Sequence, residues 1–182
     1  LEVYNRHTRS VQQLKEIGIS QPFRSIHTHP LKRQLAFFIA ETVIRSVREE
    51  EPNSALFDFL TSVIHWIEAT EKTHAEFQVM FLILLSRHLG FFPDSLLSNT
   101  NCYFDLRNGK FQPEPLHGDF IHPPLTGYFS QLIGIGLEDC GKVQLPHPIR
   151  IELLEKMTLY YKIHLPDMAK IKSLEVLEEI FP

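Results

Sequence analysis

The sequence predicts a mainly α-helical chain, in which a bundle of about six helices carries a small β-hairpin insertion and follows a short N-terminal β-hairpin. Apolar residues recur at the 3.6-residue spacing of amphipathic helices in several long segments. Residues 79–85 are apolar without interruption, so the helix that contains them must be covered on nearly all sides and is expected to be central. Apolar residues make up 43% of the 182 residues, which is enough for one packed domain with at most a small appendage.

The first twenty residues carry a strand pattern. Residues 1–4 alternate apolar and polar side chains, a polar turn follows, and residues 11–19 can form a second strand. Because two strands alone rarely persist in water, we expect residues 1–20 to be the edge of a β-domain whose earlier part precedes Leu1. Residues 21–29 are expected to be a linker.

Helices begin after this linker. Three of them are predicted, over residues 30 to about 50, Ser54–Ala69 and 73–88. Pro30 suits the first position of a helix. Thr73-x-x-Glu76 has the pattern of a capping box, and Gly90 is suited to end the third helix.

A β-hairpin then interrupts the helices. Asn108-Gly109 is a strong hairpin signal, and it lies between the apolar segments 102–106 and 110–111. Residues 112–124 are expected to be a loop. A further helix is predicted over about Leu125–Ile133.

The C-terminal part contains a long amphipathic helix and a short one. His147 and Pro148 suit the start of the long helix, and Pro166 prevents its continuation. Ser173 is then expected to be the N-cap of the last small helix.

Charge is distributed unevenly along the chain. The first 33 residues hold six cations and two carboxylates, a net charge of +4, whereas the whole chain has a net charge of −4 and the remainder therefore −8. This asymmetry suggests that the N-terminal end contacts a polyanion and the helical body does not.

Several classes of protein are not supported by the sequence. No apolar run approaches 18 residues, which argues against a membrane span, and two cysteines are too few for a disulfide framework and fit the cytoplasm. Serines such as Ser86, Ser130 and Ser173 lack the context of a catalytic nucleophile, and the phosphate-binding G-x-x-x-x-G-K-[ST] pattern does not occur.

Three separated segments resemble RecO, a family of bacterial DNA-repair proteins. They are Glu41-x₃-Arg45 followed by Glu49, Glu50, Pro52 and Leu56-Phe57-x₂-Leu60; Phe81-x₃-Leu85-x₃-Leu89-Gly90-Phe91-x-Pro93; and Arg150-x₂-Leu153-x₆-Tyr160-Tyr161-x₂-His164-x-Pro166 with Lys170-Ile171-Lys172-Ser173. Their order and spacing together carry the resemblance, which spans roughly residues 30–182.

The resemblance implies a domain organisation. RecO proteins have an OB-fold barrel ahead of a helical domain, so residues 1–20 would be the last hairpin of that barrel, residues 21–29 the linker and residues 30–182 the RecO-type helical domain. Many RecO proteins also bind structural zinc through four cysteines. This sequence has only Cys102 and Cys140, so we expect a zinc-less variant without a cofactor, in which the side chains of the Asn108-Gly109 hairpin pack in place of the metal.

The resemblance also implies a function. RecO proteins are recombination mediators rather than enzymes. They bind single- and double-stranded DNA, partner RecR, and engage the acidic C-terminal tail of single-stranded DNA-binding protein (SSB). Together these activities displace SSB, load RecA and anneal complementary strands. A cytoplasmic, nucleoid-associated protein that acts on DNA damage is therefore expected.

Two sets of cations are candidate contacts. The predicted DNA-binding set comprises Arg6, Arg9, Lys15, Arg24, Lys32 and Arg33. Tyr4 or Phe23 could stack on a base. The hypothetical set for the SSB tail comprises Arg45, Arg48, Lys170 and Lys172. Arg45 is also spaced to pair with Glu41 within its helix.

Two alternatives to a mediator remain open. A ligand-binding or dimerisation domain of an all-helical transcription regulator would share the helix count and the apolar central helix. A metal-dependent hydrolase would require the cluster His117-x-Asp119-x₂-His122 to converge on an ion. The interpretation that we favour assigns these three residues to a polar loop and assigns no metal to the chain.

Overall fold

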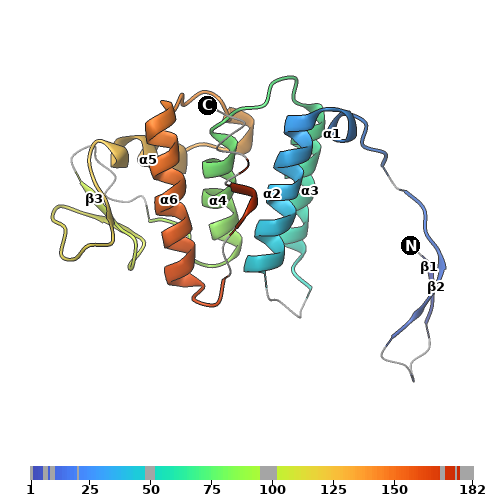
Figure 1. Cartoon of the computed structure of the whole chain (residues 1–182). Helices are drawn as coiled ribbons and strands as arrows, with labels where there is room; N and C mark the ends of the chain where they lie inside the picture. The colour runs from blue at the N-terminus through green and yellow to red at the C-terminus, as the bar shows by residue number, and fades with distance from the viewer. Residues whose placement is uncertain are drawn as a thin grey trace.

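The computed structural model describes residues 2–5, 8, 11–19, 21–47, 52–94, 102–168, 171–174 and 176. Within these residues the chain is mainly α-helical, as predicted, with a helical bundle and two small antiparallel sheets. Figure 1 shows the helices side by side and the N-terminal hairpin projecting away from them.

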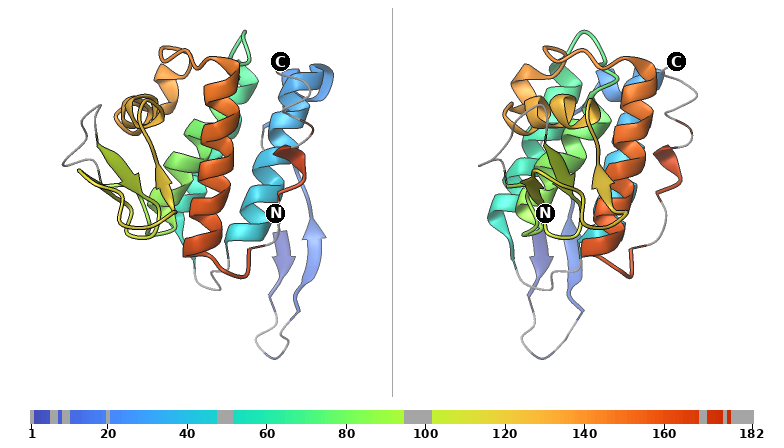
Figure 2. Two further views of the ribbon diagram at one scale, coloured as in Figure 1. Left: turned by 60° about the vertical axis from the view of Figure 1, so that its left-hand side comes forward. Right: turned by 90° about the vertical axis from the view of Figure 1, so that its left-hand side faces the viewer.

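The N-terminal hairpin consists of β1 (Glu2–Tyr4) and β2 (Gln13–Glu16), which pair antiparallel. Every residue of the two strands is exposed. The left-hand view of Figure 2 shows the two strands on the opposite side of the bundle from the second sheet. The prediction of two strands at this end is therefore confirmed, and the hairpin lies outside the core.

The bundle is built from α2 (Pro30–Ser46), α3 (Ser54–Ala69), α4 (Phe77–His88) and α6 (His147–His164). A one-turn helix, α1 (Ser25–Thr28), precedes it, and α5 (Leu125–Ile133) packs on α4. Nearly all of α4 is buried, which confirms that it is the central helix. None of the helices in the described ranges is long and apolar enough to cross a bilayer.

One buried polar side chain in α4 has no partner among the described residues. Gln78 is 1% exposed, and neither its amide nitrogen nor its amide oxygen has a hydrogen-bond partner in the part of the chain that the structure describes. An unsatisfied buried amide is destabilising, because it has lost its hydrogen bonds to water without replacing them.

The predicted capping box at the start of α4 is wrong. The helix begins at Phe77, and Glu76 makes no side-chain cap. The buried Glu76 carboxylate instead accepts a hydrogen bond from the backbone N–H of Leu145, just before α6. The Glu76 side chain therefore makes a tertiary contact with Leu145 in place of the helix cap that the local pattern predicted.

The second sheet contains the predicted hairpin and one strand that was not predicted. Strands β3 (Tyr103–Asp105) and β4 (Lys110–Gln112) pair antiparallel around a turn that contains Gly109 at φ +66°. Strand β5 (Phe120–Ile121) pairs with the other edge of β3, within the segment predicted as a loop. The hairpin side chains Phe104, Leu106 and Phe111 are buried, and they supply the apolar packing expected there.

Asp105 organises the turn of this hairpin. Its side chain is almost fully buried, and its carboxylate accepts hydrogen bonds from the backbone of Arg107 and Asn108 and from the side chains of Asn108 and Gln112. His117 Nε2 lies 3.2 Å from the same carboxylate. Burial acts to raise the pKa of Asp105, but the hydrogen bonds and the adjacent imidazole outweigh it and lower that pKa.

The Tyr-Tyr-x₂-His sequence at the end of α6 holds three segments together. Tyr160 Oη donates to the carbonyl oxygen of Phe91 at 2.6 Å, and Tyr161 Oη donates to a carbonyl oxygen of α4 at 2.7 Å. His164 Nε2 lies 3.0 Å from the carbonyl oxygen of Leu106. The motif therefore joins α6 to the central helix, to the segment after it and to the β3–β4 hairpin.

Candidate functional site

Among the predicted DNA-binding cations, Lys15 and Arg24 lie on the N-terminal arm, which we define as residues 2–24, and Lys32 and Arg33 lie in α2. Arg6 and Arg9 lie outside the described residues. Lys15 is exposed on β2, where its ammonium pairs with Glu2 of β1 at 2.7 Å. Arg24 and Arg33 are also exposed, after the hairpin and in the first turns of α2.

Lys32 differs from the other members of this set. It is only 4% exposed, and its ammonium donates to Ser25 Oγ at 2.5 Å and to the carbonyl oxygen of Glu68 at 3.0 Å. The Lys32 ammonium, on α2, therefore links α1 to the end of α3. We therefore correct the predicted set by leaving Lys32 out.

The junction between the arm and the bundle is fixed by Glu68 of α3. Its carboxylate accepts hydrogen bonds from the backbone N–H groups of Arg24, Ser25 and Ile26 at 2.8–2.9 Å, which are the first groups of α1. These bonds, led by the one from Ser25, lower the pKa of Glu68. The carboxylate thus acts as an N-cap from another helix.

The aromatic residues proposed to stack on a base lie in different surroundings. Tyr4 is exposed on β1. Phe23 is half-buried, and its ring centroid lies 5.7 Å from that of His65 on α3. Phe23 is therefore part of the surface of the bundle and not of the hairpin.

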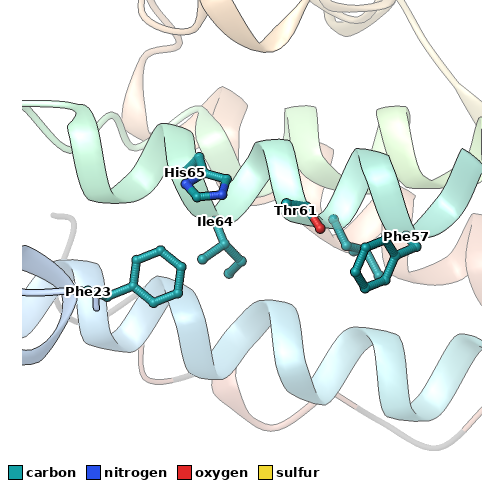
Figure 3. Close-up of a pocket in the computed structure, with 6 residues that line it drawn as sticks. Phe23, Phe57, Thr61, Ile64 and His65 are labelled. Carbon is teal, nitrogen blue, oxygen red and sulfur yellow. The ribbon is translucent and has the colours of Figure 1, made fainter. Parts of the chain in front are cut away.

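Phe23 forms one end of an apolar groove along α3 that the sequence did not predict. The groove has a volume of about 350 Å³ and is shown in Figure 3. Its lining residues are mostly apolar: Phe23, Phe57, Leu60, Thr61, Ile64 and His65. A sequence signal existed, because Phe57, Thr61 and Ile64 recur at helical spacing beside the buried face of α3.

The adjoining face of α2 is also apolar. Arg33, Phe37, Ala40 and Ile44 recur at spacings of four, three and four residues, so they lie on one face, and all four are exposed. Phe37 is 58% exposed, Ile44 is 80% exposed, and Phe57 on α3 is 69% exposed. Large exposed apolar side chains gathered in this way indicate a binding surface.

Two residues of the predicted partner-binding set, Arg45 and Lys172, contact Glu41 of α2. Arg45 pairs with Glu41 at 2.6 Å, as its spacing predicted. The backbone N–H groups of Lys172 and Ser173 donate to the same carboxylate at 3.0 and 2.7 Å. Glu41 therefore caps the last helical turn in the role predicted for Ser173. Arg48 and Lys170 lie outside the described residues.

The Glu41 contact is electrostatically favourable. Burial acts to raise the pKa of Glu41, but the hydrogen bonds from Ser173 and Lys172 and the charge of Arg45 outweigh it and lower this pKa to about 2. Ile171 and Leu174 are buried on either side of the bonded amides. The C-terminal segment is thereby fastened to α2 by one carboxylate and two apolar side chains.

The three side chains of the possible metal cluster make separate contacts, although the backbone N–H of Asp119 donates to His117 Nδ1 at 3.1 Å. His117 lies against Asp105, Asp119 pairs with Arg107 at 2.6 Å, and the His122 ring packs edge-on to Tyr103. Among the described residues, no group of three or more histidine, cysteine, aspartate or glutamate side chains is arranged to hold a metal ion.

Both cysteines are free thiols. Cys102 is half-buried and Cys140 is buried. Burial, with a smaller contribution from the nearby Glu76 carboxylate, raises the pKa of Cys140 to about 12. The neutral thiol of Cys140 therefore acts as a packing group rather than as a nucleophile.

Comparison with known proteins gives one consistent result. A family model described as "Recombination protein O C terminal" matches residues 31–175. A protein from Bacteroides fragilis named "DNA repair protein RecO" is 35% identical over 179 residues, which cover 97% of this chain and 74% of that protein. Proteins of the same name from Azobacteroides pseudotrichonymphae and Flavobacterium psychrophilum are 31% and 33% identical over the whole chain and cover 76% and 75% of their own lengths. No solved structure matches the chain.

Proposed function

Because the chain belongs to the RecO family of recombination proteins, we propose that it acts in DNA repair as a mediator and not as an enzyme. In this proposal it binds single- and double-stranded DNA, partners RecR and engages the SSB tail. It then helps to displace SSB, load RecA and anneal strands at the nucleoid. The family match along residues 31–175 is the observation that carries the proposal.

The DNA contact in this proposal is the N-terminal arm with Arg33. Lys15, Arg24 and Arg33 are exposed cations on this part of the chain, and Arg6 and Arg9 are added from the sequence. Cations of this kind neutralise backbone phosphates, and Tyr4 or Phe23 supplies a face for a base.

Residues 1–20 are also proposed to be the last hairpin of an OB-fold barrel. Their exposed apolar side chains support this assignment, because a barrel would cover them; they are Val3, Val11, Leu14, Ile17 and Ile19. Residues 21–29 are then the linker, although residues Ser25–Thr28 form α1. Residues 30–182 are the helical domain.

The DNA contact is tested by fluorescence anisotropy with a labelled single strand over a salt series. We expect weak binding by this chain that falls steeply with salt, because phosphate contacts release counterions. Charge reversal at Lys15, Arg24 and Arg33 should remove most of the binding at low salt. Lys142→Glu is the matched control, because Lys142 is an exposed lysine next to Asp139, far from the arm in sequence. Tight binding that is insensitive to salt would contradict the proposal.

The proposed docking site for the SSB tail is the cluster around Glu41. Arg45 and Lys172 come together there from opposite ends of the domain, and Arg48 and Lys170 are neighbours of these two in the sequence. Cations beside an apolar surface suit an acidic peptide that carries an aromatic residue. Substitution of all four cations by alanine should weaken binding of an SSB tail peptide in a titration, and unchanged affinity would remove these residues from the site.

A further inference from the structure

The outer face of α2 and α3 carries three large apolar side chains that the fold leaves uncovered. Phe37 and Ile44 of α2 are 58% and 80% exposed, and Phe57 of α3 is 69% exposed. Figure 3 shows Phe57 and Ile64 on the side of α3 that is turned to α2, where they line the groove of about 350 Å³. An uncovered apolar surface of this kind is typical of a protein interface.

The exposed ridge of α2, which we define as Phe37, Ala40 and Ile44, has a nearly symmetric layout. Ala40 lies near its middle, with a large apolar side chain about one turn before it and another about one turn after it. A small residue at a crossing point lets two helices approach closely, since the interaxial distance depends on the side chains at the contact. Two copies of the ridge can therefore cross at Ala40, with Phe37 of each next to Ile44 of the other.

The two ends of this face carry charges of opposite sign. Helices α2 and α3 are antiparallel, because Lys32 at the start of α2 donates to the carbonyl oxygen of Glu68 at the end of α3. The exposed Arg33 therefore lies at one end of the helix pair, and the exposed Asp58, near the start of α3, lies at the other. A two-fold rotation that reverses the helices brings each arginine to the aspartate of the other copy. A nucleic-acid backbone would instead bring phosphates to Asp58.

The area of the face suits a weak dimer. An aromatic side chain presents roughly 150–250 Å², so the exposed parts of Phe37, Ile44 and Phe57 offer about 400 Å² per copy. Two copies then bury about 800 Å² through these side chains alone, and the walls of the groove add to this area. Standard interfaces bury about 1,200–2,000 Å², so we expect a dissociation constant on the order of 10 µM.

We propose that two copies of this chain associate through α2 and α3 in an antiparallel arrangement with two-fold symmetry. Phe37 of one copy packs between Ile44 and Phe57 of the other, and Arg33 lies beside Asp58 of the other copy. The association removes the exposed apolar side chains from water. The inference rests on this helical face and not on the proposed function. Because Arg33 also belongs to the proposed DNA contact, the oligomeric state is measured without DNA.

Sedimentation velocity of the whole chain, from about 1 to about 300 µM, tests the proposal. We expect a shift from monomer to dimer centred on the order of 10 µM. Ala40→Arg places two like charges where the ridges cross, so it should weaken the dimer at least about tenfold. Leu116→Arg is the matched control, because Leu116 is an apolar residue that is 77% exposed, before β5, and this variant should dimerise like the parent chain. Circular dichroism melting verifies that each variant is folded.

A charge exchange tests the antiparallel arrangement. Arg33→Asp and Asp58→Arg should each weaken the homodimer about tenfold, because two attractive pairs become repulsive. In an equimolar mixture of the two variants, both ends of a heterodimer again pair opposite charges, so the mixture should regain the parent affinity. The double variant Arg33→Asp with Asp58→Arg should regain it as well.

Several outcomes contradict the proposal. A dimer that Ala40→Arg leaves unchanged would place the contact elsewhere on the molecule. A mixture of the two charge variants that associates no better than either variant alone would rule out the antiparallel pairing. A chain that stays monomeric at the highest concentration would show that a second copy does not cover this face. If, in addition, Phe37→Glu lowered the binding of a labelled single strand, the face would be assigned to nucleic acid.

Discussion

Glu41 offers the sharpest test of how the C-terminal segment is held. In Glu41→Gln the charge is lost, so the bonds from Lys172 and Ser173 and the pair with Arg45 become bonds to a neutral amide. Lowering the pKa from 4.5 to about 2 corresponds to about 3 kcal/mol. Water screens a side chain that is 20% exposed, so we expect a loss of about 1.5 kcal/mol at neutral pH.

The pH dependence follows from the direction of this shift. A carboxylate with a lowered pKa in the folded chain stabilises it fully above its ordinary pKa of 4.5, and this stabilisation is lost as the pH falls towards about 2. The difference in unfolding free energy between the parent chain and Glu41→Gln should therefore be constant above about pH 5.5 and shrink below pH 4.5.

Urea unfolding between pH 3 and pH 7 measures this difference, and hydrogen exchange at Lys172 and Ser173 measures the local contact. The exchange of these two amides should be about tenfold faster in Glu41→Gln at neutral pH. Glu155→Gln, at an exposed position of α6, is the control and should match the parent chain. If Glu41→Gln and Glu155→Gln behave alike, or if the gap persists unchanged to pH 3, the reasoning is refuted.

Further predictions concern the core and the hairpin. Asp105→Asn should lower the unfolding free energy by about 2–4 kcal/mol, because it removes a buried charge that holds the turn, whereas Asp119→Asn, at a more exposed pair, should cost less than about 1 kcal/mol. Gln78→Met should raise the melting temperature, because it removes an unsatisfied buried amide with little change of volume; a lower one would mean that the amide has a role in the fold. A chelator should leave the melting temperature unchanged, and a clear decrease would indicate a structural metal. A thiol reagent at pH 8 should modify Cys102 well before Cys140, and equal rates would contradict the burial of Cys140.

The helices and the hairpin were predictable because local signals define them. The ends of α3 agree with the prediction, since Asn53 caps the helix by accepting a hydrogen bond from the backbone N–H of Leu56. Asn108-Gly109 likewise marked the hairpin, although Gly109 has the positive φ and Asn108 does not, so the two residues end a four-residue loop between Asp105 and Lys110 rather than form a two-residue turn. The central position of α4 followed from its uninterrupted apolar run.

The candidate surfaces were less predictable, because they depend on contacts between distant residues. Charge counting placed Lys32 with the DNA-binding cations, although its spacing from Leu35 and Ile39 puts it on the buried face of α2. Glu41 and Ser173 are separated by 132 positions, and no local pattern connects them. The groove arises only when Phe23, from the linker, is placed beside α3.

The cap that Glu68 provides for α1 has a consequence for the geometry of the whole molecule. Three successive N–H groups converge on this single carboxylate, and Lys32 and Phe23 add further contacts to α3 at the same junction. The direction in which the arm leaves the bundle is therefore fixed by a few side chains at one end of α3. Neutralising Glu68 would remove three of these contacts and loosen the hairpin relative to the helices while the bundle keeps its shape.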